Sequence, residues 1–221
     1  MKRMRMMGLC LVAIFAVAAI AASSASAKTV LTFSTSAGAL NPGDPIATFS
    51  SNLIFETSAG NLECEENELR GKVTINKATK DKASVTEEES KGNFEKIPGA
   101  CKTSATGPVI IVSSGFPWPV EFVAAKKTGK VKGTKKVAFD STFLALEGPN
   151  NHCTFEASKV AFSFNATTTK TPVTLTTTKQ TFKHNKKAPN QTALCPASGV
   201  LSGTFNASSA GKTVESQLET V

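Results

Sequence analysis

The chain has 221 residues, of which 40% are hydrophobic, and its 25 Lys and Arg against 17 Asp and Glu give a formal net charge of +8. This hydrophobic fraction is enough for a compact core, so disorder along the whole chain is excluded. Two His exclude a metal site built on several histidines, and three Asp leave few groups for catalysis near neutral pH.

Residues 1–27 have the organisation of a signal peptide. A basic segment, Met1–Arg5, precedes an apolar stretch from Leu9 to Ala22, and Ala25-Ser26-Ala27 supplies the small residues of a cleavage site. A retained membrane anchor is the alternative, but the apolar stretch is shorter than the roughly 20 residues that span a bilayer. We therefore expect cleavage after Ala27 and an exported, secreted or extracellular chain of 221 − 27 = 194 residues with no transmembrane segment.

The mature chain alternates apolar residues with Thr, Ser and Lys at a period of two. Val30–Ser34, Ser158–Phe164 and Pro172–Thr176 show this alternation, which is typical of half-buried strands. Turn residues interrupt the pattern at short intervals, as in Asn41–Pro45 and Gly148–Asn151. These features predict an all-β fold of the sandwich or barrel type.

Two segments resemble each other and suggest an internal repeat. When Thr48–Asn76 is laid over Ala138–Asn165, Cys64 falls on Cys153 and Asn76 on Asn165, both at an offset of 89. Chance similarity of Thr- and Ser-rich strands is the alternative. We predict two tandem related β units, residues 28–130 and 131–221, too long for the repeats of a solenoid.

Cys10 lies in the expected signal peptide, so cleavage leaves four cysteines. In an exported chain these four predict two disulfides. Three pairings are possible, and self-contained units would select Cys64 with Cys101 and Cys153 with Cys195. A four-cysteine zinc site is disfavoured because structural zinc takes closely spaced cysteine pairs, whereas these cysteines lie at least 37 positions apart.

Two surface features are candidate ligand contacts. Phe116 and Trp118 are separated and followed by prolines, so they form either a rigid aromatic loop that contacts a ligand or a plug at the end of the core. The segment Ala124–Lys136 is rich in lysine and either binds an envelope glycan or anionic polymer or is a solvated hairpin that protects strand edges. Its candidate contacts are Lys126, Lys127, Lys130 and Lys132.

The sequence contains no recognisable catalytic constellation. His152 and His184 are the only histidines, and Gly199–Gly203 is not the Gly-x-Ser-x-Gly motif of hydrolases. Glutamates cluster within Glu63–Glu68 and Glu87–Glu89, which we expect at exposed strand ends or in loops. We expect no cofactor and no metal. Nucleic acid is not an expected partner, because Arg70 is the only arginine of the mature chain.

The segments that begin at Cys153 (Cys-Thr-Phe-Glu-Ala-Ser-Lys-Val) and at Cys195 (Cys-Pro-Ala-Ser-Gly-Val-Leu-Ser-Gly-Thr-Phe) resemble the uncharacterised secreted β-rich proteins of actinobacteria. The resemblance implies a secreted bacterial β fold and brings no activity or functional residue. We expect a non-enzymatic binding or structural module at the cell envelope or outside the cell. The alternative is a secreted polysaccharide-active enzyme whose carboxylates converge only in the fold.

Overall fold

The computed structural model describes residues 27–50, 52–90, 93–94, 97–98, 100–103, 108–132, 136–143 and 151–221. The predicted signal peptide lies outside these residues except for Ala27. The described chain is almost entirely β, as predicted, and its one helical element is the 3-10 turn η1 (Ala124–Lys126). No helix in this part of the chain is long and apolar enough to cross a membrane.

Most described strands belong to eight antiparallel strand paths, each of which pairs with the next path along the chain. Six paths contain two strands each and two contain one. In chain order the paths are β3 (Pro45–Ser50) with β4 (Leu53–Thr57), β5 (Gly60–Cys64) with β6 (Asn67–Ile75), β7 (Lys80–Ser90) with β10 (Ala100–Thr103), β11 (Val109–Ser114) with β12 (Trp118–Val123), β13 (Thr128–Val131) with β14 (Val137–Phe143), β15 (Asn151–Ala157) with β16 (Val160–Phe164), β18 (Thr174–His184), and β19 (Ser198–Ser209).

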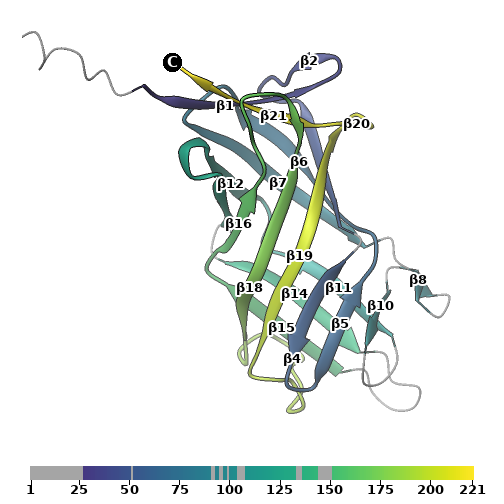
Figure 1. The fold of residues 1–221 in the computed structure, drawn as a ribbon. Coiled ribbons are helices and arrows are strands. Elements are labelled where there is room, and N and C mark those ends of the chain that lie inside the picture. The colour runs from purple at the N-terminus through teal and green to yellow at the C-terminus, as the bar shows by residue number, and fades with distance from the viewer. Residues whose placement is uncertain are drawn as a thin grey trace, which may run out of the picture.

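The last strand path returns to the first and closes the sheet. β19 pairs with β3 through Asn206↔Phe49 and with β4 through Leu201↔Phe55. The result is an elongated up-and-down barrel, with the unbroken β18 and β19 running from one end to the other (Figure 1). Because β19 also pairs with β18, it has neighbouring strands on both sides and no free edge.

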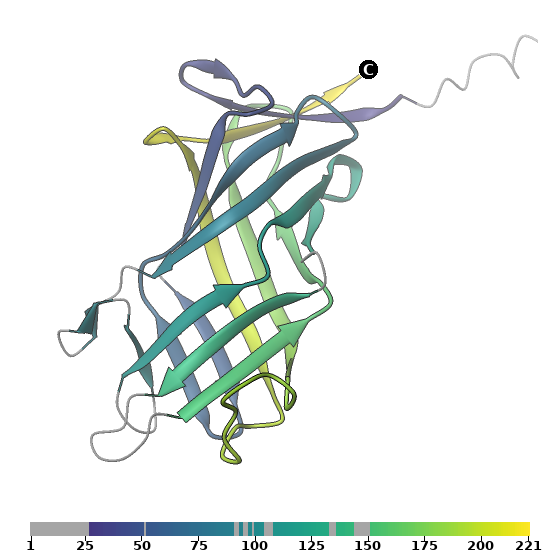
Figure 2. The same cartoon turned by 180° about the vertical axis from the view of Figure 1, so that it is seen from behind.

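A small second sheet lies across one end of the barrel, as both ribbon views show (Figures 1 and 2). Its order is β17 (Thr171–Pro172), β21 (Glu215–Thr220), β1 (Thr29–Thr35) and β2 (Gly38–Ala39). Lys28 and Val221 exchange two backbone hydrogen bonds of 3.0 Å, so the first residue of the expected mature chain lies beside the last residue. Short strands outside both sets are β8 (Asn93–Phe94), β9 (Ile97–Pro98) and β20 (Lys212–Thr213).

Both predicted disulfides are confirmed: Cys64 is bonded to Cys101 and Cys153 to Cys195. The first joins the neighbouring strands β5 and β10. The second joins β15 to the loop of residues 185–197, at the end of the barrel away from the small sheet. Gln191 strengthens this attachment, because its Oε1 accepts a hydrogen bond from Thr154 N at 2.6 Å.

The structure does not confirm tandem units. The proposed boundary between residues 130 and 131 falls inside β13, and the barrel is completed by strands from both sides of it. The matched asparagines nevertheless make similar hydrogen bonds at the end of the barrel that the small sheet covers, here called the capped end. Asn76 accepts a hydrogen bond from Phe33 N and donates to Phe33 O, while Asn165 accepts from Thr174 N and donates to Pro172 O. The duplication therefore stays a prediction.

Candidate ligand cavity inside the barrel

The period-two pattern fills the barrel interior with apolar side chains. On β12, Trp118, Val120 and Phe122 are buried whereas Pro119 is exposed, as the alternation of a strand requires. An eight-stranded barrel has an interior just wide enough to be filled by side chains or to hold one small ligand. Which of the two applies depends on how the side chains pack.

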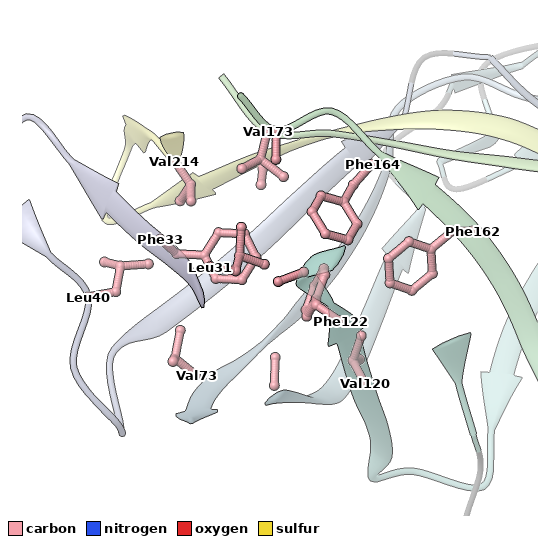
Figure 3. Packing of buried hydrophobic residues seen from close by; sticks show 14 residues of the cluster. Leu31, Phe33, Leu40, Val73, Val120, Phe122, Phe162, Phe164, Val173 and Val214 are labelled. Atoms are coloured by element: carbon pink, nitrogen blue, oxygen red, sulfur yellow. The ribbon is translucent and has the colours of Figure 1, made fainter. Parts of the chain in front are cut away.

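The buried side chains form two main clusters, one towards each end of the barrel. In the capped-end cluster, Leu31 and Phe33 of β1 insert into the barrel and the Phe33 ring packs edge-on against Phe122, 4.9 Å between centroids (Figure 3). The far-end cluster is centred on Phe55, whose ring centroid lies 5.0 Å from those of Phe139 and Phe155. Edge-to-face pairs of this kind stabilise a core beyond the area that they bury.

Two glycines of the barrel wall lie close to phenyl rings of the interior. A Cβ at Gly199 would come within 2.1 Å of the Phe55 ring, and a Cβ at Gly129 within 2.3 Å of the Phe162 ring. Each glycine therefore makes room for a phenyl ring of a neighbouring strand. Sequence reasoning did not assign this role to either glycine.

A cavity of about 140 Å³ lies inside the barrel between the two clusters. Val85 of β7 and Val131 of β13 line it, and both pack against both clusters. Several other lining residues face inward and are only partly buried. Those from the remaining walls include Ile46, Leu69, Ile111, Leu175, Leu201 and Phe205.

The cavity wall is almost entirely apolar, with few polar groups. The Thr177 hydroxyl donates a hydrogen bond to Ala161 O at 3.0 Å, and Trp118 Nε1 donates to Ser114 O at 3.1 Å, so both are satisfied within the protein. Thr48 of β3 and Ser113 of β11 also line the cavity, and among the described residues neither hydroxyl has a hydrogen-bond partner. These two hydroxyls are the polar groups available to a molecule in the cavity.

One stretch of the wall beside the cavity lies between β7 and β11. β7 pairs with β12 as far as Val85↔Trp118, and β10 pairs with β11 at Ala100↔Ile110. Between these points the described residues contain no ladder pair that joins β7 to β11.

Trp118 is not a surface group. Its side chain is 5% exposed and lines the cavity, and Phe116 stacks on it with 4.3 Å between ring centroids. The interpretation as an exposed aromatic loop is therefore wrong, and of the two interpretations the core one applies. The predicted ligand contact at Trp118 is possible only from the interior.

Residues 124–127 of the lysine-rich segment form the turn between β12 and β13, and η1 lies in this turn. Lys126, Lys127 and Lys132 are exposed, while Lys130 Nζ lies 2.8 Å from Glu121 Oε1. This hydrogen bond lowers the pKa of Glu121, and the charges of Lys130, Lys80 and Lys82 add to the effect. β13 pairs with β12 and β16, so these lysines do not protect a free edge.

Members of both acidic clusters lie beside Arg70, the one arginine among the residues that the structure describes. Arg70 Nη2 lies 2.8 Å from Glu68 Oε2, and Arg70 Nη1 lies 3.7 Å from Glu87 Oε1. Glu68 is 4% exposed, so the expectation of an exposed cluster is wrong for this member; Glu63, Glu65 and Glu66 are exposed as expected. No carboxylate is among the described residues that line the cavity.

Asp81 is a buried carboxylate that sequence reasoning counted but did not single out. Its side chain has no exposed surface, and burial raises its pKa to about 7 against the opposing effect of the hydrogen bond donated by Ala78 N. Oδ1 accepts that bond at 2.8 Å, whereas Oδ2 has no partner among the described residues. Asp81 precedes the inward-facing Ala83 and Val85 by even steps, and that alternation was the available signal.

The histidines belong to the far end of the barrel. His152 Nδ1 lies 3.1 Å from Thr142 Oγ1, and His184 Nε2 lies 3.0 Å from Gln191 Oε1. Within the described chain, no group of three or more His, Cys, Asp and Glu side chains is placed to hold a metal ion. No family model, curated protein or solved structure matches the chain.

Proposed function

We propose that this protein is an exported, non-enzymatic binding protein that holds a small molecule inside its barrel. The observation that carries the proposal is the apolar cavity of about 140 Å³ between two densely packed aromatic clusters. The signal-peptide-like segment and the two disulfides support export, since disulfides persist in oxidising compartments.

The energetics of the empty space support an occupant. A residual cavity costs about 24 cal/mol per Å³, so the cavity in this barrel corresponds to about 3 kcal/mol of lost stability. One larger side chain at Val85 or Val131 would fill much of that space. A bound molecule offsets the cost in the same way as such a side chain.

The experiment measures binding of benzene to the mature protein, Lys28–Val221, by fluorescence of Trp118 and by the shift in melting temperature. An engineered apolar cavity of about 150 Å³ binds benzene, so a cavity of this size has room for one ring. We expect saturable binding to the wild type and none to Val85→Phe, whose ring occupies the cavity. Val112→Phe is the matched control, because Val112 is 56% exposed on the outer face of β11.

If Val85→Phe does not fold, Val131→Leu gives the same test with one added methylene and should weaken binding. Absence of saturable benzene binding to the wild type would overturn the proposal, and so would equal binding by the folded Val85→Phe variant.

A polymer contact at Lys126, Lys127 and Lys132 is a separate proposal, and the exposure of these side chains supports it. Binding of an anionic polymer through them should fall steeply with salt. Binding inside the apolar cavity should not fall steeply with salt.

A further inference from the structure

We infer that the ligand of the cavity is a small neutral molecule of about six to ten non-hydrogen atoms, with a hydrocarbon body and one hydroxyl or carbonyl group that bonds to Thr48 or Ser113. The inference rests on the proposed function and names the chemical class of the ligand.

The size of the ligand follows from the volume of the cavity. A volume of about 140 Å³ is close to that of an apolar cavity that accepts benzene, and is smaller than the 300 Å³ or more of typical drug-sized pockets. The Phe55, Phe139 and Phe122 rings that border the space are held by aromatic neighbours, so a long chain would have to displace packed rings. A single ring or a short branched hydrocarbon fits without that displacement.

The inference that the ligand is uncharged follows from the residues that line the cavity. The described residues that line the cavity include no Lys, Arg, His, Asp or Glu, and Cys64 is held in a disulfide. Asp81 lies on the same face of β7 but beyond Ala83 and does not line the cavity. A carboxylate or an ammonium group would therefore lose its hydration without gaining a partner of opposite charge.

The inference that the ligand has a single polar group follows from the hydroxyls of Thr48 and Ser113. Thr177 Oγ1 and Trp118 Nε1 already donate to backbone carbonyls, whereas the Thr48 and Ser113 hydroxyls have no partner among the described residues. Thr48 lies on the first strand path and Ser113 on the fourth, so the two hydroxyls stand on different walls. One oxygen of the ligand bonds to one hydroxyl and leaves the rest of the molecule against apolar side chains.

The test compares four compounds that share one ring: toluene, benzyl alcohol, benzoate and benzylamine. Calorimetry on the mature protein should show benzyl alcohol binding about threefold to tenfold more tightly than toluene, the effect of one hydrogen bond. Benzoate and benzylamine should bind at least about 100-fold more weakly than benzyl alcohol, because each buries an unpaired charge.

The variants Thr48→Val and Ser113→Ala, alone and combined, test which hydroxyl bonds to the ligand. The combined variant should lose the preference for benzyl alcohol and keep the affinity for toluene. Thr181→Val is the matched control, because Thr181 is exposed on the outer face of β18.

The outcomes separate this inference from the proposed function. If none of the four compounds and no benzene binds, the proposed function fails and the inference with it. If toluene binds as tightly as benzyl alcohol, if a charged compound binds within tenfold of it, or if the preference survives the combined variant, the inference on ligand class is wrong and the cavity function stands.

Discussion

Replacing Asp81 by Asn tests how much a buried charge lowers the stability of the folded barrel. The carboxylate has no exposed surface, its Oδ1 accepts the Ala78 N–H, and Oδ2 has no partner among the described residues. Asn is nearly isosteric and keeps an oxygen that can accept the Ala78 bond. The substitution therefore removes the ionisation and little else.

The direction and the size of the expected change in stability with pH follow from the pKa of Asp81. Burial raises the pKa of Asp81 from 3.8 to about 7 in the folded protein, so between these values the native state holds a proton that the unfolded chain has released. The stability that Asp81 contributes is fully present below pH 3.8 and is lost as the pH rises through about 7. A shift of about three pKa units corresponds to about 4 kcal/mol at most.

The assay is urea unfolding of the wild type and Asp81→Asn at pH 4 and pH 8. The wild type should lose up to about 4 kcal/mol more than the variant between these two values. Glu219→Gln, on an exposed residue of β21, controls for removal of a carboxylate and should follow the wild type. Equal pH dependence of wild type and Asp81→Asn would refute the argument that the charge of Asp81 is buried at a cost.

Three further predictions concern the core. Trp118 should emit at short wavelength and resist quenching by iodide, and Trp118→Ala should cost about 3 to 5 kcal/mol of unfolding free energy; emission like that of free Trp would contradict its burial. Replacing Cys153 and Cys195 by Ser should cost about 4 kcal/mol on the chain-entropy model for a separation of 42 residues, measured by thermal unfolding without reductant, and no change in melting temperature would count against it. Gly199→Ala should destabilise the protein by about 1 to 3 kcal/mol, because its Cβ would meet the Phe55 ring; an unchanged denaturation midpoint would show that the ring moves freely.

The local pattern of the sequence determined the strands and the disulfides. Alternation of apolar and polar residues, as in Val160–Phe164, depends on neighbours in the chain, and β16 has that alternating burial. The Cys64–Cys101 and Cys153–Cys195 pairs followed from the expectation that each of two related units is self-contained. Both inferences need no knowledge of which strands meet.

Only the tertiary structure decided that the strands close into one barrel. Sandwiches and barrels share the period-two pattern, and the backbone hydrogen bonds that join β19 to β3 and β4 do not depend on residue type. Closure brings together segments that lie far apart in the sequence, such as those of Phe55 and Leu201, and the sequence has no local mark of such a pair.

The cavity and its wall were also decided by tertiary structure. Whether Trp118 faces solvent or the interior depends on how β12 is turned in the barrel, and two flanking prolines are compatible with either. Thr48 and Ser113 look like ordinary strand residues in the sequence, because unfilled space is a property of side chains from several strands together. Packing density is set by the sum of volumes across the barrel, so the sequence determined the strands and their inward faces, while the three-dimensional arrangement decided where unfilled space was left.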